Sequence, residues 1–443
     1  MAGSSGQSQS VQEEHARFNF FTLAAYQVTM RVGWIFKTES IIMPVIMDLL
    51  CGPGTALAAW MRSWLPQLNR FGQSIPQVFF AGRIRQTGRK KLVVAICSLL
   101  MGMVFLGLAF LWWCFDGEAS RLMQVSFLVL YALFFICVGV NNLGFNTLQG
   151  KLVQYDFRGR LFLLANLVGG GAAIVAAWFL LGHWFDEQGG NFVALFTFAG
   201  ICFLAGALLA LAGREDRDRA PASAGASDSV LTLPLTLIRK NRQFRILAMI
   251  AACFGTSMVL FPHYQALFRE AATDAESAFS FRVLIFWVIM QNGGTVLFSL
   301  FAGPAADRFG NRAVLRGLLL MIFCAPLLAM AFSSNPALAR AQYFWVFLFV
   351  GVTPVTIRVL NNFALELAPA DLHPQFLSVL SLCMALPVIL VSQFVGWAIP
   401  RIGFFPVFWA IAVVILIGWL FTFSVKEPRS RLTSGDCQGD NLK

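Results

Sequence analysis

Four ionisable side chains, Lys37, Glu39, Arg70 and Arg358, stand inside long apolar stretches of the sequence. A charge at membrane depth costs at least about 2.5 kcal/mol, so such residues are candidates for binding or ion pathways. Arginine presents a planar fork that suits a carboxylate or a phosphate. Because three cations face one carboxylate, the set predicts an anionic organic solute. If protons drive the movement of this solute across the membrane, Glu39 is the candidate proton-coupling residue.

Uncharged polar residues accompany these cations at helical spacing. Gln73 lies three positions after Arg70, and Asn362 lies four positions after Arg358, so each pair shares a helix face. The predicted substrate-binding residues are Lys37, Arg70, Gln73, Asn142, His263, Gln291, Arg358 and Asn362. The alternative for the amides is hydrogen bonding between helices. For Arg70 and Arg358 it is an ion pair with Glu39 or a contact with a helix end, and cavity water could also solvate them.

The composition shows which elements must position these residues. Apolar residues make up 58% of the chain, charged residues 12%, and the mean hydropathy is +0.70. Windows of about 18–25 apolar residues are long enough to cross a bilayer, and backbone groups in lipid require helices. We place about twelve spans at 27–50, 61–82, 91–114, 122–145, 160–184, 191–212, 244–267, 279–302, 313–333, 341–365, 376–399 and 403–424.

Lysine and arginine are distributed unevenly between the two sets of loops. They gather at 83–91, at 151–160, between the halves at 214–245, and at 308–316, whereas the opposite loops hold few. By the positive-inside rule this pattern predicts a multi-pass protein of the cell membrane with both termini cytoplasmic. A basic face against anionic lipid accounts for the net charge of +11, so we expect no nucleic-acid partner.

The loop GPAADRFGNR, from Gly303 to Arg312, lies between two apolar windows. Its pattern Gly-x-x-x-Asp-Arg-x-Gly-x-Arg resembles the cytoplasmic loop signature of the major facilitator superfamily of transporters. The resemblance implies a gating loop, made of Gly303, Asp307, Arg308, Gly310 and Arg312, that favours the state closed to the cytoplasm. Gly303 would let two helices approach closely, and Gly310 would allow a left-handed turn. The alternative is a basic turn that only anchors the topology.

A degraded copy of this loop, AGRIRQTGRKK from Ala81 to Lys91, occupies the corresponding place in the first half. Arg85 stands where the acidic residue is expected, so this copy favours topological anchoring at least as much as gating. The strings VNNLGFNTL and VLNNFALEL also match between the halves. The predicted fold class is therefore an all-α membrane protein with the major facilitator fold. It has about twelve transmembrane helices in two six-helix pseudo-repeat bundles.

The predicted domains are a cytoplasmic N-terminal segment 1–26, a bundle 27–212, a cytoplasmic linker with a surface helix 213–243, a bundle 244–424 and a cytoplasmic tail 425–443. The first boundary has an alternative, because the stretch from Phe18 to Leu50 is too long for one plain span. If the helix begins near Phe18, Arg31 moves inward. The glycine run GGG after Val168 predicts close helix packing.

These features together predict secondary-active transport of a small solute by alternating access, with uniport and proton coupling both open. The alternatives are a lipid or drug exporter of the same fold, and a non-transporting membrane receptor or scaffold. No Walker, G-x-S-x-G or HExxH motif occurs, so we expect no enzyme activity. The nine cysteines and four histidines lack metal spacing, which predicts neither metal nor cofactor. The expected partners are the solute and membrane lipid, and the protein is expected to be a monomer.

Overall fold

The computed structural model describes residues 15–115, 117–118, 120–153, 155–185, 190–217, 238–239, 241–272, 281–368 and 372–426. The first half contains α2 (Ala16–Ile35), α3 (Ile42–Cys51), α4 (Ala56–Gln86), α5 (Lys90–Phe115), α6 (Arg121–Leu152), α7 (Tyr155–Ala176), the π-helical η1 (Ala177–Leu181), α8 (Gly182–Trp184) and α9 (Phe192–Ala212). The second half contains α11 (Arg242–Thr256), the 3-10 helix η2 (Ser257–Leu260), α12 (Phe261–Ala271), α13 (Phe281–Phe309), α14 (Asn311–Ser333), α15 (Pro336–Gln342), α16 (Phe344–Val350), α17 (Thr353–Leu367), α18 (His373–Ile402) and α19 (Phe404–Phe421).

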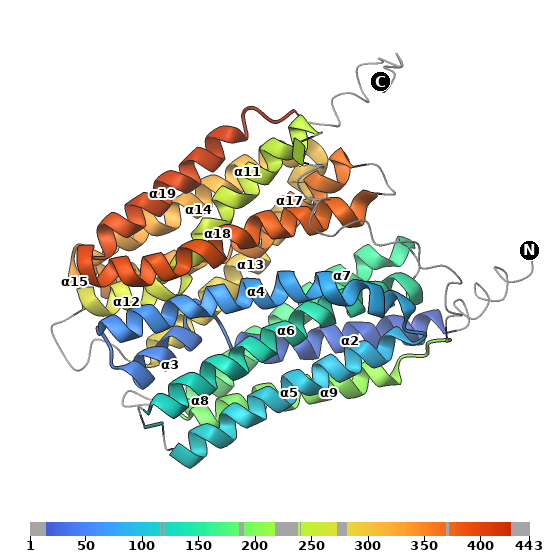
Figure 1. Cartoon of the computed structure of the whole chain (residues 1–443), viewed down its shortest axis with the longest axis horizontal. Helices are drawn as coiled ribbons and strands as arrows, with labels where there is room; N and C mark the ends of the chain where they lie inside the picture. The colour runs from blue at the N-terminus through green and yellow to red at the C-terminus, as the bar shows by residue number, and fades with distance from the viewer. Residues whose placement is uncertain are drawn as a thin grey trace, which may run out of the picture.

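The two halves repeat the same packing, which confirms the predicted pseudo-repeat. In the first half α5 packs on α9, α4 on α6, and α2 on both α9 and α7. In the second half the equivalent helices pair in the same way: α14 on α19, α13 on α16, and α11 on both α19 and α18. Figure 1 shows the result as two bundles lying side by side, with the start of α2 and the end of α19 on one side of the molecule. We name this the terminal side and the opposite one, where α3 and α12 end, the far side.

The bundles meet through two equivalent helix pairs, α4 with α18 and α7 with α13. A glycine brings the first pair together on the far side. A methyl group added to Gly396 of α18 would lie 2.3 Å from the Ser63 hydroxyl oxygen and 3.0 Å from the Ala59 carbonyl oxygen of α4. The two backbones therefore touch at this level, and the far side is closed.

The first transmembrane span is broken, and it begins earlier than the main prediction. Its first helix, α2, begins at Ala16 and not near residue 27, and the chain leaves helical geometry between Phe36 and Ile41 before α3 starts. The Thr38 hydroxyl accepts a hydrogen bond from the Ile42 N–H at 3.2 Å, which ties the irregular segment to the first residue of α3. The over-long stretch from Phe18 to Leu50 is thus two helical pieces joined by an irregular segment. Unwound segments of this kind are found at the ligand sites of transporters.

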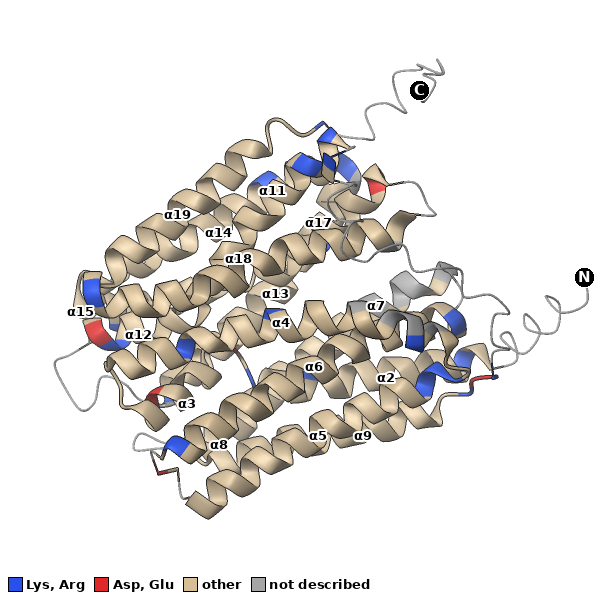
Figure 2. Cartoon of the chain, viewed as in Figure 1, with Lys and Arg blue, Asp and Glu red and all other residues tan. Residues whose placement is uncertain are grey.

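Ten helices of the described chain are long and apolar enough to cross a membrane. The remaining two spans of the predicted twelve are the broken α2–α3 unit and α4, which carries the polar residues Arg62, Asn69, Arg70 and Gln73. Figure 2 shows that lysine and arginine gather on the terminal side, while the length of both bundles is almost free of charge. This arrangement agrees with the loop asymmetry in the sequence.

The segment after α9 was predicted to be linker from residue 213 onward, but its first residues are fixed to the first bundle. The buried Glu215 carboxylate accepts hydrogen bonds from the N–H groups of Lys90 and Lys91, each at 2.8 Å, at the start of α5. Lys151 at the end of α6 forms an ion pair with the same carboxylate at 3.0 Å. Glu215 therefore joins three elements. Most of the predicted surface helix lies outside the described residues.

Candidate solute-binding cavity

A cavity of about 590 Å³ lies between the two bundles. It is lined by the α2–α3 unit, α4, α6 and α7 from the first half, and by α13 and α17 from the second. Along α6 it extends from Val138 to Gln149, less than one turn from the end of that helix on the terminal side. Of the predicted site residues, the structure brings seven together here: Lys37, Glu39, Arg70, Gln73, Asn142, Gln291 and Arg358.

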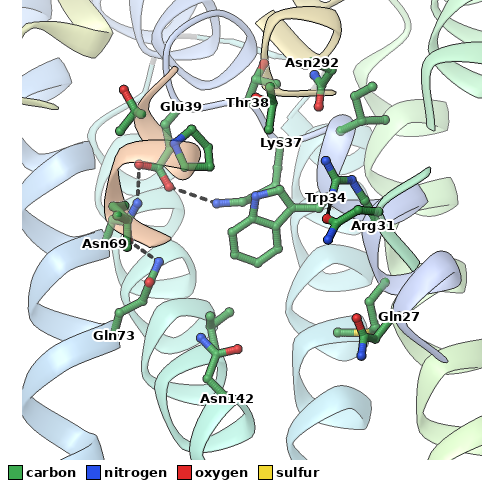
Figure 3. A pocket seen from close by; sticks show the side chains of 18 of the residues that line it. Gln27, Arg31, Trp34, Lys37, Thr38, Glu39, Asn69, Gln73, Asn142 and Asn292 are labelled. Atoms are coloured by element: carbon green, nitrogen blue, oxygen red, sulfur yellow. Dashed lines mark hydrogen bonds and ion pairs between the residues drawn. The ribbon is translucent and has the colours of Figure 1, made fainter. Parts of the chain in front are cut away.

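The irregular segment after α2 places an ion pair against this cavity. Lys37 Nζ lies 2.9 Å from Glu39 Oε1, and the other carboxylate oxygen of Glu39 accepts a hydrogen bond from the Asn69 amide of α4. The Gln73 amide in turn donates to Asn69 Oδ1 at 2.5 Å. Figure 3 shows these four side chains in one continuous chain of contacts beside the cavity. Glu39 is thus held from both α4 and its own segment.

Lys37 is enclosed more completely than a ligand-binding cation needs to be. Its side chain is 1% exposed, and the ammonium lies 3.9 Å from the centre of the Trp34 ring and 4.0 Å from that of Phe135. Aromatic faces and one carboxylate together offset its charge. Lys37 is therefore neutralised by a fixed partner of the protein.

Two polar contacts cross between the halves close to this pair. The Ser40 hydroxyl donates to Gln291 Oε1 of α13 at 2.5 Å, and the Arg70 guanidinium donates to the sulfur of Met258 in η2. Both contacts use residues from irregular or 3-10 segments, where helix geometry is interrupted. The Lys37–Glu39 pair therefore sits beside the joint between the two bundles.

A second cationic group joins the bundles farther toward the terminal side. The guanidinium of Arg31 on α2 donates to the side-chain oxygen of Asn166 on α7, and Arg358 on α17 donates to that same oxygen at 3.1 Å. One amide oxygen thus receives two arginines, one from each half, and all three residues line the cavity. We refer to Arg31 and Arg358 as the arginine pair.

The glycine run of α7 explains how Arg31 reaches this position. A methyl group added to Gly169 would lie 3.3 Å from the Arg31 side chain and 3.3 Å from the Val28 backbone. A methyl group on Gly170 would lie 3.0 Å from Val296 of α13. The run therefore allows α7 to contact both α2 and α13, which confirms the predicted packing role.

Two predicted substrate-binding residues lie away from this cavity. His263 is fully buried on the far side, with Nε2 3.3 Å from the Ser63 hydroxyl of α4. The outward position of α12, the far-side piece of the broken seventh span, places it there and outside both cavities described for the chain. Asn362 lines the second of these cavities, on the terminal side.

The surroundings of His263 form a buried polar network that joins the halves on the far side. The Asp48 carboxylate of α3 pairs with Arg62 of α4, in its own half. From the second half, Gln265 donates to it at 2.6 Å, and Arg269 lies 3.5 Å away. We refer to Asp48, Arg62, Gln265 and Arg269 as the far-side network. It accompanies the close packing of α4 on α18.

The predicted gating loop lies at the terminal end of α13 and agrees with the prediction only in part. Gly310 has φ +83° and starts α14, which confirms the left-handed turn. Gly303 was predicted to allow close helix approach, but nothing lies within 4 Å of a methyl group added there. The reason is that α13 borders a cavity at this level. Arg312 donates to the Val425 carbonyl at 3.2 Å, Arg308 is exposed, and the side chain of Asp307 lies outside the described part of the chain.

Sequence reasoning missed Asn166 and left Arg31 open. The signal for Arg31 was present, because the excess length of the first apolar stretch allowed a helix that begins near Phe18 and carries Arg31 inward. Asn166 gave no comparable signal, since a single amide beside a glycine run is typical of helix packing. Only its position between two arginines from different halves distinguishes it.

A sequence profile described as MFS/sugar transport protein matches residues 79–372. The chain belongs to this family. None of the curated proteins matches it. The nucleoside transporter NupG has a similar structure, with a TM-score of 0.69 and 12% identity over 92% of this chain and 100% of that one. A D-xylose-proton symporter gives 0.65 and 12%, over 93% and 98%.

The inward-open xylose transporter XylE from E. coli is also similar, with a TM-score of 0.63 and 14% identity over 94% of this chain and 97% of that one. At these identities the likeness shows the fold alone. The family and fold together establish a multi-pass membrane transporter of the major facilitator superfamily.

Proposed function

We propose that the chain is a secondary-active transporter of an organic anion that works by alternating access. The observation that carries the proposal is the arginine pair, in which one guanidinium from each half meets at a single neutral oxygen. Like charges brought together in a cavity of low dielectric favour an anion between them. A carboxylate or phosphate matches the fork of each guanidinium.

The position of the arginine pair couples anion binding to the relative movement of the two bundles. Arg31 and Arg358 belong to different bundles, so an anion held by both of them ties the bundles together on the terminal side of the cavity. The far side is already closed by the far-side network. Closure around the anion followed by opening of the far-side network would carry the solute across, with the loop Gly303–Arg312 favouring closure on the terminal side.

Glu39 is the proposed proton-coupling residue. It is the carboxylate among the residues that line the cavity, and it is already engaged with Lys37 and Asn69. Protonation would remove its attraction for Lys37 and leave one more positive charge facing the cavity. Anion binding would then be favoured when Glu39 is protonated, which is the sign needed for symport of an anion with a proton.

The test uses purified protein and a panel of lactate, succinate, citrate, glycerol phosphate, xylose, uridine and lysine. We expect an anion of the panel to raise the thermal unfolding temperature and to enter proteoliposomes. Arg31→Gln and Arg358→Gln should each weaken its binding about 10- to 150-fold, because each removes a charge-assisted hydrogen bond of about 1.5–3 kcal/mol. Arg401→Gln, at the exposed far end of α18, is the matched control. Binding of only neutral or cationic solutes, unchanged in both cavity variants, would refute the proposal.

A further inference from the structure

A second cavity, of about 450 Å³, adjoins the arginine pair on its terminal side. Arg31, Asn166 and Arg358 line both cavities, so the two spaces share this cationic group as a common wall. The rest of the second cavity is mainly apolar and is lined by Leu167, Val296, Leu300, Ala302, Gly303, Pro304, Ala306, Val355 and Val359, with Ser299 and Asn362. We name it the side cavity.

The side cavity lies beside α13, on the terminal side of the contact between α7 and α13. The two helices touch where Gly170 meets Val296, and farther along Trp178 of η1 contacts the ring of Phe286 of α13. On the terminal side of these contacts nothing lies within 4 Å of a methyl group added to Gly303, which leaves a gap beside α13. The gap extends along α13 from Ser299 to Ala306, roughly 10 Å at 1.5 Å per residue.

Two leucines flank this gap. Leu167 of α7 and Leu300 of α13 are 43% and 48% exposed. Both lie within apolar spans, Leu164–Trp184 and Arg282–Ala306, that are long enough to cross a membrane. The side cavity therefore provides a mainly apolar space beside two guanidinium groups.

We propose that the transported anion is a single-chain amphiphile, with a carboxylate or phosphate head on the arginine pair and its hydrocarbon chain in the side cavity. A short, fully polar anion would leave this mainly apolar space unfilled. A neutral lipid would bring no negative charge to the arginine pair. The inference rests on the proposed function, because it gives the chemical class of the anion that the same arginine pair binds.

The test measures binding to the protein in nanodiscs for butyrate, octanoate and dodecanoate, with octanol as the neutral probe and empty nanodiscs to subtract partitioning. Each buried methylene contributes about 0.8 kcal/mol, which is about a fourfold gain in affinity. We expect octanoate to bind at least about tenfold more tightly than butyrate, and octanol to bind weakly. Arg358→Gln should weaken octanoate about as much as butyrate.

A variant that fills the side cavity distinguishes the contribution of the hydrocarbon chain to binding from that of the head group. Ala302→Phe, at a buried position that lines the side cavity, should remove most of the gain of octanoate over butyrate while leaving butyrate unchanged. Ser299→Phe, one turn away, is a second filling variant in case the first does not fold. Leu297→Phe is the matched control, because Leu297 is 43% exposed on the same helix and lines neither cavity.

Two failures are distinguishable. If butyrate and octanoate bind with equal affinity and neither filling variant changes these affinities, the side cavity holds no hydrocarbon chain. This inference is then overturned, while the proposed function stands. If none of the anions binds, both the proposed function and this inference are overturned. A lysophosphatidic acid tested in the same way distinguishes a single-chain lipid from a free fatty acid as the source of this chemistry. Binding of either supports the inference.

Discussion

We expect the far-side network to stabilise the state in which the far side of the transporter is closed. Gln265 of the second half donates to Asp48 of the first at 2.6 Å, and both side chains are almost fully buried. Gln265→Met keeps the size of the side chain and removes only this donor. Arg62 and Arg269 still face Asp48, so the carboxylate keeps its charge partners.

The size of the effect follows from the type of bond that is lost. A hydrogen bond to a charged group contributes about 1.5–3 kcal/mol when buried. When the far side opens, Gln265 and Asp48 part and water solvates both, so the substitution costs little in that state. We therefore expect the equilibrium to move toward the far-side-open state by about 10- to 150-fold.

The assay is a distance measurement between two spin labels on the far side, one in each half, at the exposed positions Leu57 and Ile402 in a cysteine-depleted background. The variant should populate longer distances than the parent protein without ligand. Gln342→Met is the matched control, because Gln342 bonds only to Trp345 within its own half. An unchanged distance distribution in folded Gln265→Met protein would refute the idea that this network holds the far side closed.

Four further predictions address coupling, gating, stability and topology. Glu39→Gln should abolish accumulation driven by a pH gradient while solute exchange survives, and wild-type accumulation would remove Glu39 from the mechanism. Asp307→Asn should slow initial transport rates at unchanged expression, whereas equal rates would favour a purely topological loop. Glu215→Gln should lower the free energy of unfolding by about 1–3 kcal/mol in thermal melts, because the anchored start of α5 loses its charged acceptor; the exposed Glu118→Gln is the control. A membrane-impermeant thiol reagent should label the exposed far-side Cys114 in intact cells and reach Cys437 only after permeabilisation, and equal labelling would contradict cytoplasmic termini.

The fold was predictable because the bilayer imposes a simple rule on composition. Apolar windows, basic loops and the matching halves all follow from the cost of burying charge and backbone in lipid. The break in the first span was harder to place. Its residues Phe36 to Ile41 are not a glycine or proline turn, and only the excess length of the stretch from Phe18 indicated that something interrupts it.

The residues that line the cavity were easier to predict than their arrangement. Intramembrane charge selected Lys37, Glu39, Arg70 and Arg358, and all four line the cavity, while their predicted roles stay predictions. Which cation pairs with the carboxylate depends on distances across several helices, which periodicity along one helix does not contain. His263 was predicted to bind the solute, but it lines neither cavity, because the cavity does not reach its level in the seventh span.

The irregular segment between α2 and α3 has a mechanical consequence. Residues two apart on a continuous helix point to nearly opposite faces and cannot pair. The contact between Lys37 and Glu39 therefore exists only while the helix is broken between them. Any movement that rewinds this segment must first pull the two charges apart, and discharging Glu39 lowers the cost of doing so. Rewinding of the helix and protonation of Glu39 are in this way thermodynamically coupled. A proton can therefore change the shape of the protein through the six backbone residues from Phe36 to Ile41.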